Sequence, residues 1–198
     1  MKDEFNSELP MISGKPRVVI VDLDDVLFHT NPIFAGVEKM GLSGDDLWQC
    51  FHQEVHKCSV NGWCRDLIMA LNFSGIRPVF ITARSKEIEN TTRMSIIECL
   101  NTVIFDLYMR KLGDKRPSDL VKEEILHDKV LPRYAVLFAL DDDIKNCEMY
   151  VKYGIPVLHV MNAEARACPN VTKYSKTLAM SGVSETDVYD KQRGYENG

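Results

Sequence analysis

The chain has 198 residues, of which 45% are hydrophobic and 27% charged, enough for one domain with a hydrophobic core. Its net charge of −5 argues against a broad nucleic-acid-coating surface, although it leaves room for a small basic pocket. No apolar run approaches the roughly 20 residues of a membrane span, and the acidic start lacks the apolar segment of a secretory signal, so we expect a cytoplasmic protein that does not bind membranes.

Short β-branched runs alternate with amphipathic stretches along the chain. The expected strands are residues 17–21, 78–81, 102–108, 134–140 and 156–160. The expected helices are residues 45–57, 63–73, 86–100, 118–131 and 144–153. Several strands are continuously apolar, which is typical of strands covered on both faces. This order predicts an α/β fold with a parallel, Rossmann-like sheet and helices on both faces.

The connection between the first two strands is too long for a simple crossover. We therefore expect residues 28–77 to form a small helical cap inserted after the first strand. Residues 16–27 and 78–175 would then form the core domain. The polar ends, residues 1–15 and 176–198, are expected to be a flexible arm and a polar tail.

Acidic residues follow two of the expected strands. Asp22 and Asp24 come directly after the first strand, and the pleat directs both to the same side. Asp141 and Asp142 follow the fourth strand in the same way. Carboxylates gathered in this manner repel one another unless a divalent cation relieves the repulsion, and hard cations prefer oxygen ligands. Either acidic pair alone would be read as a turn or a helix cap.

Two further strand or helix ends carry groups that suit a phosphate. Thr82 and Arg84 follow the second strand, where a hydroxyl can donate to the anion and a guanidinium can clamp it. Lys122 lies near the start of a helix whose expected N-cap is Ser118, and that end of a helix favours anions. Each residue alone has an ordinary structural explanation. Four such features at successive strand or helix ends are unlikely to occur together by coincidence.

These four motifs together resemble the haloacid-dehalogenase (HAD) superfamily of phosphatases. They are DLDDVL, the threonine of VFITARS, the lysine of SDLVKEEI and the acidic pair of FALDDDIKN. The stretch from Gly113 to Gly154 is similar to the 3′-phosphatase domain of bacteriophage polynucleotide kinase-phosphatases. If a bacteriophage encodes the chain, the cytoplasm in question would be that of the host.

The resemblance implies a role for each matching residue. Asp22 would be the nucleophile that forms an aspartyl-phosphate, and Asp24 the general acid and then the general base. Thr82 and Lys122 would hold the phosphoryl oxygens, with Arg84 also on the phosphate. The implied Mg²⁺ would be bound by Asp22, Asp141, Asp142 and the backbone carbonyl of Asp24.

Three positions depart from the family pattern. Asp25 and Val26 stand where phosphatases commonly have glycine and threonine, and Ser118 stands where the phage domain has an acid. These departures bear on the identity of the substrate more than on the type of reaction.

Histidines and cysteines suggest no second chemistry. His52 and His56 lie four residues apart near two cysteines, but HQEVH is neither of the zinc-protease patterns, so we favour an ordinary helix. The chain has no CxxC pair, and we expect reduced thiols. The six cysteines are Cys50, Cys58, Cys64, Cys99, Cys147 and Cys168. The given sequence also contains no GxxxxGK[ST] loop for binding ATP.

Two features bear on the substrate. The segment 110–122 is basic, and Lys115 and Arg116 are expected to border the pocket, although a solvated basic loop explains them nearly as well. Trp48, Phe51 and Trp63 could stack on a base or simply pack the cap.

The leading hypothesis is a phosphatase for 3′-phosphate ends of nucleic acids or for nucleotides. The alternatives are a phosphatase for free (deoxy)nucleoside monophosphates, similar to a 5′-nucleotidase, and a non-catalytic phosphate-binding module. Hydrolysis of 3′-phosphorylated oligonucleotides faster than 5′-mononucleotides would favour the first. The sequence does not indicate the oligomeric state.

Overall fold

The computed structural model describes residues 11–12, 14–101 and 103–161. By its internal contacts the chain divides into Met1–Val160 and Met161–Gly198, and the fold described below belongs to the first unit. The expected tail at 176–198, the last part of the expected core and Cys168 lie outside the described residues.

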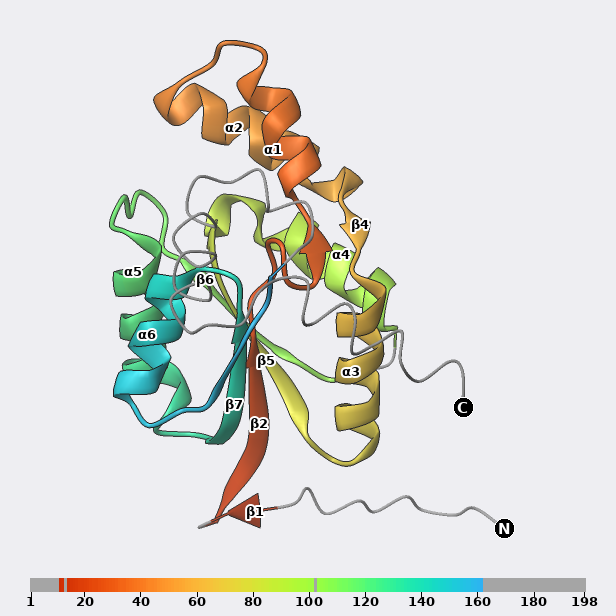
Figure 1. The fold of residues 1–198 in the computed structure, drawn as a ribbon, viewed down its shortest axis with the longest axis vertical. Helices are drawn as coiled ribbons and strands as arrows, with labels where there is room; N and C mark the ends of the chain where they lie inside the picture. The colour runs from red at the N-terminus through yellow and green to blue at the C-terminus, as the bar shows by residue number, and fades with distance from the viewer. Residues whose placement is uncertain (1–10, 13, 102, 162–198) are drawn as a thin grey trace, which may run out of the picture. The chain divides into compact units, whose positions relative to one another are not determined.

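Five parallel strands form the centre of the domain, in the order β6–β5–β2–β7–β8 (Figure 1). Their bounds are β2 Lys15–Val21, β5 Arg77–Ser85, β6 Asp106–Arg110, β7 Ala135–Asp141 and β8 Val157–His159. A short strand, β1 (Met11–Ile12), pairs antiparallel with the start of β2. Ordered structure therefore extends into the segment that the sequence predicted to be a loose arm.

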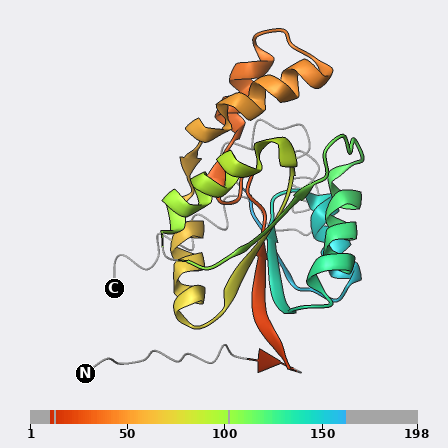
Figure 2. The same cartoon turned by 180° about the vertical axis from the view of Figure 1, so that it is seen from behind.

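Alternating residues of β2 face two separate hydrophobic cores. Val19 and Val21 pack with residues of α3 (Gly62–Phe73) and α4 (Glu89–Leu100). Val18 and Ile20 pack with residues of η3 (Leu126–Val130) and α6 (Ile144–Lys152). Figures 1 and 2 show α3 and α4 on one face of the sheet, with α6 and α5 (Ser118–Ile125) on the other. The predicted α/β fold, with a parallel sheet covered on both faces, is confirmed.

The strand predicted at residues 102–108 begins later than expected. Pairing with β5 starts at Asp106, which is opposite Val79. Two of the apolar residues before it pack in the core instead: Val103 is buried, and the Phe105 ring packs edge-on against Phe80 with centroids 5.5 Å apart. Hydrophobicity correctly indicated that Val103 and Phe105 pack in the core, but it did not show that they lie outside the strand pairing.

The insertion after β2 begins and ends with a small antiparallel pair. This pair is β3 (Phe28–His29) with β4 (Ser59–Val60). Between them lie α1 (Asn31–Glu38), α2 (Gly44–Glu54) and η1 (Val55–Lys57), which stand beyond the carboxyl end of the sheet in Figure 1. The next helix, α3, returns to the sheet and buries Cys64 and Ile68 in its core. Helices α1 and α2 are therefore the part of the insertion that stands over the strand ends, and we call them the cap helices.

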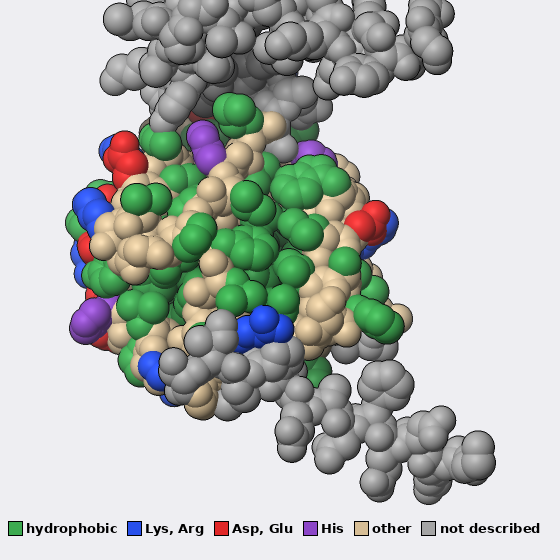
Figure 3. Space-filling view, turned by 60° about the horizontal axis from the view of Figure 1, so that its bottom comes forward, with side chains coloured by type: hydrophobic (Ala, Val, Ile, Leu, Met, Phe, Trp, Pro, Cys, Tyr) green, Lys and Arg blue, Asp and Glu red, His purple; other side chains and the backbone are tan. Residues whose placement is uncertain are grey.

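The surface at the end of the domain away from the cap helices is largely hydrophobic. Figure 3 shows hydrophobic side chains over much of this end, with acidic and basic side chains toward its margins.

Among the described residues, no helix is both long and apolar enough to cross a membrane. The five cysteines in the described part of the chain form no disulfide with one another.

Candidate active site

Two neighbouring strands and one helix bring Asp22, Asp141 and Lys122 together. The pairing of Val21 with Leu140 places the next residues, Asp22 and Asp141, at the same edge of the sheet. Lys122 Nζ lies 3.0 Å from Asp22 Oδ1 and 2.7 Å from Asp141 Oδ2. The three side chains are 8%, 0% and 1% exposed for Asp22, Asp141 and Lys122, so this is a buried charge cluster. The structure thus brings together the predicted nucleophile, a predicted metal ligand and the predicted lysine.

Lys122 is a buried cation held by its two carboxylate partners. Burial alone would lower the pKa of Lys122, but Asp141 and Asp22 raise it well above its ordinary value. The helix that carries it, α5, starts at Ser118 with Pro117 in the N-cap position, so the prediction that Ser118 is the N-cap is wrong by one residue. The proline ring restricts the backbone of Pro117 to an extended conformation just before the helix, and no side chain among the described residues caps the helix there.

The three residues of the run Asp141–Asp143 make different contacts. Asp141 Oδ1 accepts from Asn146 Nδ2 at 2.8 Å and from the backbone N–H of Asp143 at 3.1 Å. Asp143 caps α6 by accepting from the backbone N–H of Lys145 at 2.8 Å. The carbonyl of Asp142 lies 2.9 Å from His159 Nε2. These contacts fix the orientation of Asp141. The Asp142 contact uses its backbone carbonyl, so its carboxylate can take part in the site.

Three carboxylates lie close enough to share one cation. Asp22, Asp141 and Asp142 each offer an oxygen, and these oxygens lie within 4.8 Å of one another. Burial, aided by Asp141 and Asp142, raises the pKa of Asp22 well above its ordinary value despite the lowering effect of Lys122. Burial and then Asp141 raise the pKa of Asp142 to about 7. One lysine therefore does not balance the cluster, and an all-oxygen donor set of this charge suits a hard divalent cation.

Arg84 binds Asp24 in the structure. Its Nε lies 3.0 and 3.1 Å from the two oxygens of Asp24, and its second terminal nitrogen lies 2.7 Å from Oδ1. The guanidinium also lies over the Phe28 ring, 5.6 Å from its centroid, and the side chain is 2% exposed. A charged fork of this kind holds a carboxylate in one orientation.

A break in the β5–β6 ladder explains why Arg84 reaches Asp24. Thr82 pairs with Met109 and Ser85 with the next residue, Arg110, so Ala83 and Arg84 stand outside the register. Such a bulge re-aims a side chain at the end of a strand. The buried Thr82 hydroxyl accepts from the Arg84 backbone N–H at 3.1 Å, which leaves its own O–H available to donate.

Asp25 has a structural reason to depart from the family pattern. Its φ of +55° lies in the left-handed region, where glycine is favoured and aspartate is one of the better substitutes. Its Oδ1 accepts from the backbone N–H groups of Thr30 and Asn31, at 2.9 and 3.0 Å, where α1 begins. The residue thus makes the sharp turn after Asp24 and anchors the start of the first cap helix.

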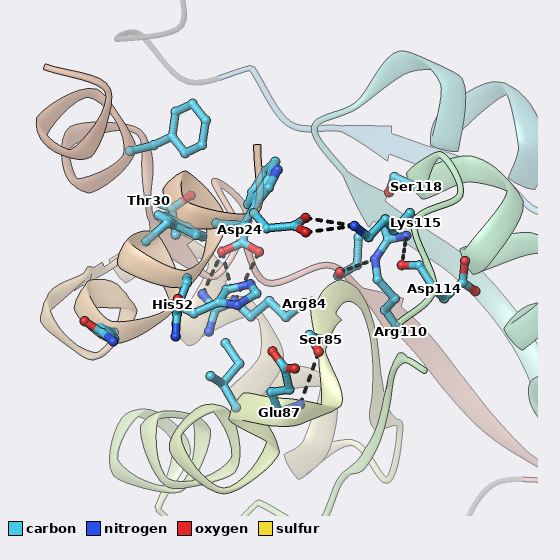
Figure 4. A pocket seen from close by; sticks show the side chains of 18 of the residues that line it. Asp24, Thr30, His52, Arg84, Ser85, Glu87, Arg110, Asp114, Lys115 and Ser118 are labelled. Carbon is cyan, nitrogen blue, oxygen red and sulfur yellow. Dashed lines mark hydrogen bonds and ion pairs between the residues drawn. The ribbon is translucent and has the colours of Figure 1, made fainter. Parts of the chain in front are cut away.

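A cleft of about 1350 Å³ lies between the cap helices and the strand ends (Figure 4). Asp24 and Arg84 line it from the core, and Phe34, Trp48 and His52 line it from the cap helices. Asp22, Lys122, Asp141 and Asp142 are not among its lining residues. The cleft therefore reaches Asp24, two residues from Asp22, and not the charge cluster itself.

The predicted basic rim is largely neutralised by acids. Arg116 forms a fork with Asp114, with distances of 2.6 to 3.1 Å, and also pairs with Glu124 at 2.6 Å. Lys115 reaches Asp45 on α2, with Nζ 2.8 and 3.0 Å from its oxygens. Both Lys115 and Arg116 line the cleft, but Lys115 has the more exposed and more easily exchanged partner. Their role in substrate binding stays a prediction.

Comparison with known proteins decides the family. Residues 16–164 match the family described as "Polynucleotide kinase PNKP phosphatase domain". The chain belongs to that family. The predicted HAD-type resemblance is therefore confirmed, and membership favours an enzyme, a phosphatase, over the non-catalytic binding module.

Solved structures support the fold of this PNKP-type phosphatase domain. A chain from the Pnkp1/Rnl/Hen1 RNA repair complex matches with a TM-score of 0.62 and 19% identity over 78% of this chain, and a second Pnkp1/Rnl/Hen1 complex with 0.60 and 19% over 79%. This chain spans 46% and 50%, about half, of the length of those proteins. A class C acid phosphatase from Bacillus anthracis matches with a TM-score of 0.56 and 12% identity, over 75% of this chain and 67% of the other. At these identities the likeness concerns the fold alone.

The PNKP-type domain has site neighbours that sequence reasoning missed. Asn146, which orients Asp141, was signalled only by its place in the first turn of the helix after the acidic run. Tyr150 is fully buried near Lys122, its hydroxyl has no hydrogen-bond partner among the described residues, and burial raises its pKa well above the ordinary value. His52 lines the cleft although its histidine pair pointed to no chemistry. No sequence signal marked Tyr150, and none linked His52 to the cleft, because only the fold brings them to the site.

Proposed function

We propose that this phosphatase hydrolyses 3′-phosphate ends of nucleic acids through an aspartyl-phosphate on Asp22, with Mg²⁺ bound by Asp22, Asp141 and Asp142. One observation carries the proposal: Asp22 is buried against Lys122 and Asp141, with Asp24 two residues further on, held by Arg84. A buried nucleophile beside a fixed cation, next to a second oriented carboxylate, is what stepwise phosphoryl transfer requires.

The acidic cluster fits the proposed metal. Its three carboxylates supply oxygen ligands only, and the raised pKa values of Asp22 and Asp142 indicate a local shortage of positive charge. The backbone carbonyl of Asp24 is the further ligand that the family resemblance implies. When bound, Mg²⁺ would neutralise charge on the phosphoryl oxygens and keep Asp22 ionised.

The first step uses Asp22 and Lys122. An Asp22 carboxylate oxygen attacks phosphorus, the bond from phosphorus to the ester oxygen breaks, and Asp24 gives its proton to that leaving oxygen. Lys122 lies beside Asp22, where it would offset the negative charge of the phosphoryl group as the Thr82 hydroxyl donates to it. In the second step, Asp24 takes a proton from water, the water oxygen bonds to phosphorus, and the Asp22 carboxylate leaves as phosphate is released.

The Arg84 fork bears directly on the part played by Asp24. Two-point binding suits the base step, in which Asp24 has to be ionised and correctly aimed. For the acid step Asp24 has to carry a proton, so one oxygen must give up its contact with Arg84. We infer that Arg84 acts by positioning Asp24 and does not itself bind the phosphate.

The substrate class is supported by the family and by the cleft. The family's description names a polynucleotide kinase, and the cleft reaches Asp24, the residue that would protonate the leaving group. Lys115, with its exposed partner Asp45, is the rim cation best placed to exchange an acid for a backbone phosphate. A free (deoxy)nucleoside monophosphate remains the alternative substrate.

Phosphate release measured across three substrate groups tests the function. With Mg²⁺ present, we expect 3′-phosphorylated oligonucleotides to be hydrolysed faster than 5′-mononucleotides and sugar phosphates, with Asp22→Asn as the blank. Added EDTA should stop release from every substrate. Release from 5′-mononucleotides that is faster than release from 3′-phosphorylated oligonucleotides of any length would favour the alternative and remove the 3′-end proposal.

Arg84→Lys should lower kcat by roughly 10- to 100-fold on 3′-phosphorylated oligonucleotides, because lysine keeps the charge but loses the fork that aims Asp24. The fall should be much smaller on an aryl phosphate, whose leaving group needs little protonation. Measuring kcat on both substrates checks this, with the thermal midpoint as a control for folding. An equal fall on both would instead place Arg84 on the phosphate itself.

A further inference from the structure

One tryptophan of the cap helices is exposed in the cleft although aromatic neighbours fix its position. Trp48 on α2 lines the cleft and is 51% exposed. Its ring packs edge-on against Phe51 at 6.0 Å and tilted against Phe34 at 5.5 Å. Phe51 is buried, so one side of this aromatic cluster closes the packing of α1 on α2 and Trp48 presents the other. A large apolar ring held rigidly in a cleft is a binding surface with little entropy left to lose.

His52 extends this aromatic surface toward the reacting groups. Its ring lies 6.4 Å from that of Trp48, at an interplanar angle of 42°. Figure 4 shows His52 near Asp24 and Arg84. Burial lowers the pKa of His52, and Asp24 and Arg84 lie close enough for their charges to affect that pKa as well. Trp48 and His52 therefore form a shelf of two rings that leads to Asp24.

The leaving group of the reaction has to lie on this side of the site. Asp24 protonates the leaving oxygen in the proposed reaction, so the rest of the leaving group occupies the space beside Asp24, and that space is the cleft. A nucleotide leaving group carries a base with two apolar faces, which exposed indoles bind by stacking without regard to sequence.

We propose that Trp48, with His52 beside it, is a stacking subsite for a nucleobase of the substrate's leaving group. The proposal rests on the proposed function, because it takes the leaving group to be a nucleotide. It makes Trp48 a specificity-determining residue that distinguishes nucleotide substrates from other phosphomonoesters.

Trp63 is a matched control for Trp48. The chain has two tryptophans, and Trp63 is 49% exposed, but it lies on α3 and does not line the cleft. In a Trp63→Phe background, intrinsic indole fluorescence comes from Trp48 alone. Adding Asp22→Asn prevents turnover and keeps the substrate intact.

Fluorescence titration of Trp63→Phe/Asp22→Asn tests stacking directly. A 3′-phosphorylated oligonucleotide should quench Trp48, whereas the same oligonucleotide with abasic sugars at its 3′ end should bind with little quenching. Equal quenching by both probes, or none by either at saturation, would overturn the proposal.

Steady-state kinetics give the second measurement. Trp48→Ala should raise KM for base-bearing 3′-phosphates by roughly tenfold, with KM for the abasic substrate unchanged, because stacking on one base is worth about one to two powers of ten. Trp48→Phe should recover most of the loss, and Trp63→Ala should match the wild type. An equal change on both substrates, or no change on either, contradicts the subsite. Failure of the proposed function would look different: the wild-type enzyme would then release phosphate no faster from base-bearing 3′-phosphates than from 5′-mononucleotides, whatever residue 48 is.

Discussion

Replacing Lys122 with methionine should destabilise the protein by about 3–5 kcal/mol, because it removes the cation from a buried cluster and leaves Asp22 and Asp141 unpaired. For a domain of this size, such a loss lowers the thermal midpoint by roughly 6–20 °C. The same change should lower kcat by roughly 100- to 1000-fold, since it removes a fixed donor to the phosphoryl group. Thermal unfolding and phosphate release measure the two effects on one preparation.

Lys129→Met is the matched control for this change. Lys129 lies on η3, the continuation of the same helical run, and is exposed. Its replacement should shift the midpoint by no more than a degree or two and leave kcat unchanged. A Lys122→Met protein as stable and active as Lys129→Met would show that the buried contacts of Lys122 carry neither stability nor catalysis.

Asp22→Asn should lower kcat by roughly 10⁴-fold or more, because an amide cannot form the covalent bond to phosphorus. The change is nearly isosteric, and Lys122 keeps its 2.7 Å contact with Asp141, so the protein should remain folded. The folded state is checked by thermal unfolding, and activity by phosphate release from a 3′-phosphorylated oligonucleotide.

Asp143→Asn controls for the loss of one acid near the site. Asp143 is the third residue of the acidic run, and its role in the structure is to cap α6. Asparagine caps helices about as well as aspartate, so kcat should stay close to that of the wild type. If Asp143→Asn were as damaging as Asp22→Asn, general electrostatics rather than a nucleophile would explain both.

The position of the charge cluster could be predicted because it depends on local rules. Apolar runs of strand length, each ending in acids, put Asp22 and Asp141 at the carboxyl edge of a parallel sheet, where such sheets hold their sites. Lys122 followed from its place in a helix and from the order of the motifs. The alternation of Val18 to Val21 between two cores likewise follows from the period of a strand.

The partner of Arg84 could not be predicted from the sequence. The residue types at the end of β5 suggested a phosphate clamp, but the side chain meets Asp24 because the ladder slips between Thr82 and Ser85. Register shifts of this kind depend on how two distant segments pack, and no local pattern records them. The same holds for Lys115 and Asp45, which lie 70 residues apart in sequence.

The cap segment was read correctly as helical but less well in detail. Helix α1 was not located by the sequence, because its short run from Asn31 to Glu38 mixes apolar residues with glycine and proline. Helix α3 was assigned to the cap by its position in the chain, and the structure shows Ile68 on that helix buried in the core under the sheet. An insertion that returns to the sheet with its last helix looks, in sequence, like a longer cap.

The central claim is that Asp22 carries the phosphoryl group during turnover. Acid quenching of a single turnover on a 3′-[³²P]-phosphorylated oligonucleotide, followed by borohydride reduction and peptide mapping, tests it most directly. We expect transient labelling of the wild-type protein that needs Mg²⁺, is absent in Asp22→Asn, and yields homoserine at position 22 after reduction. Phosphate release without protein-bound label, or label that persists in Asp22→Asn, would contradict the account.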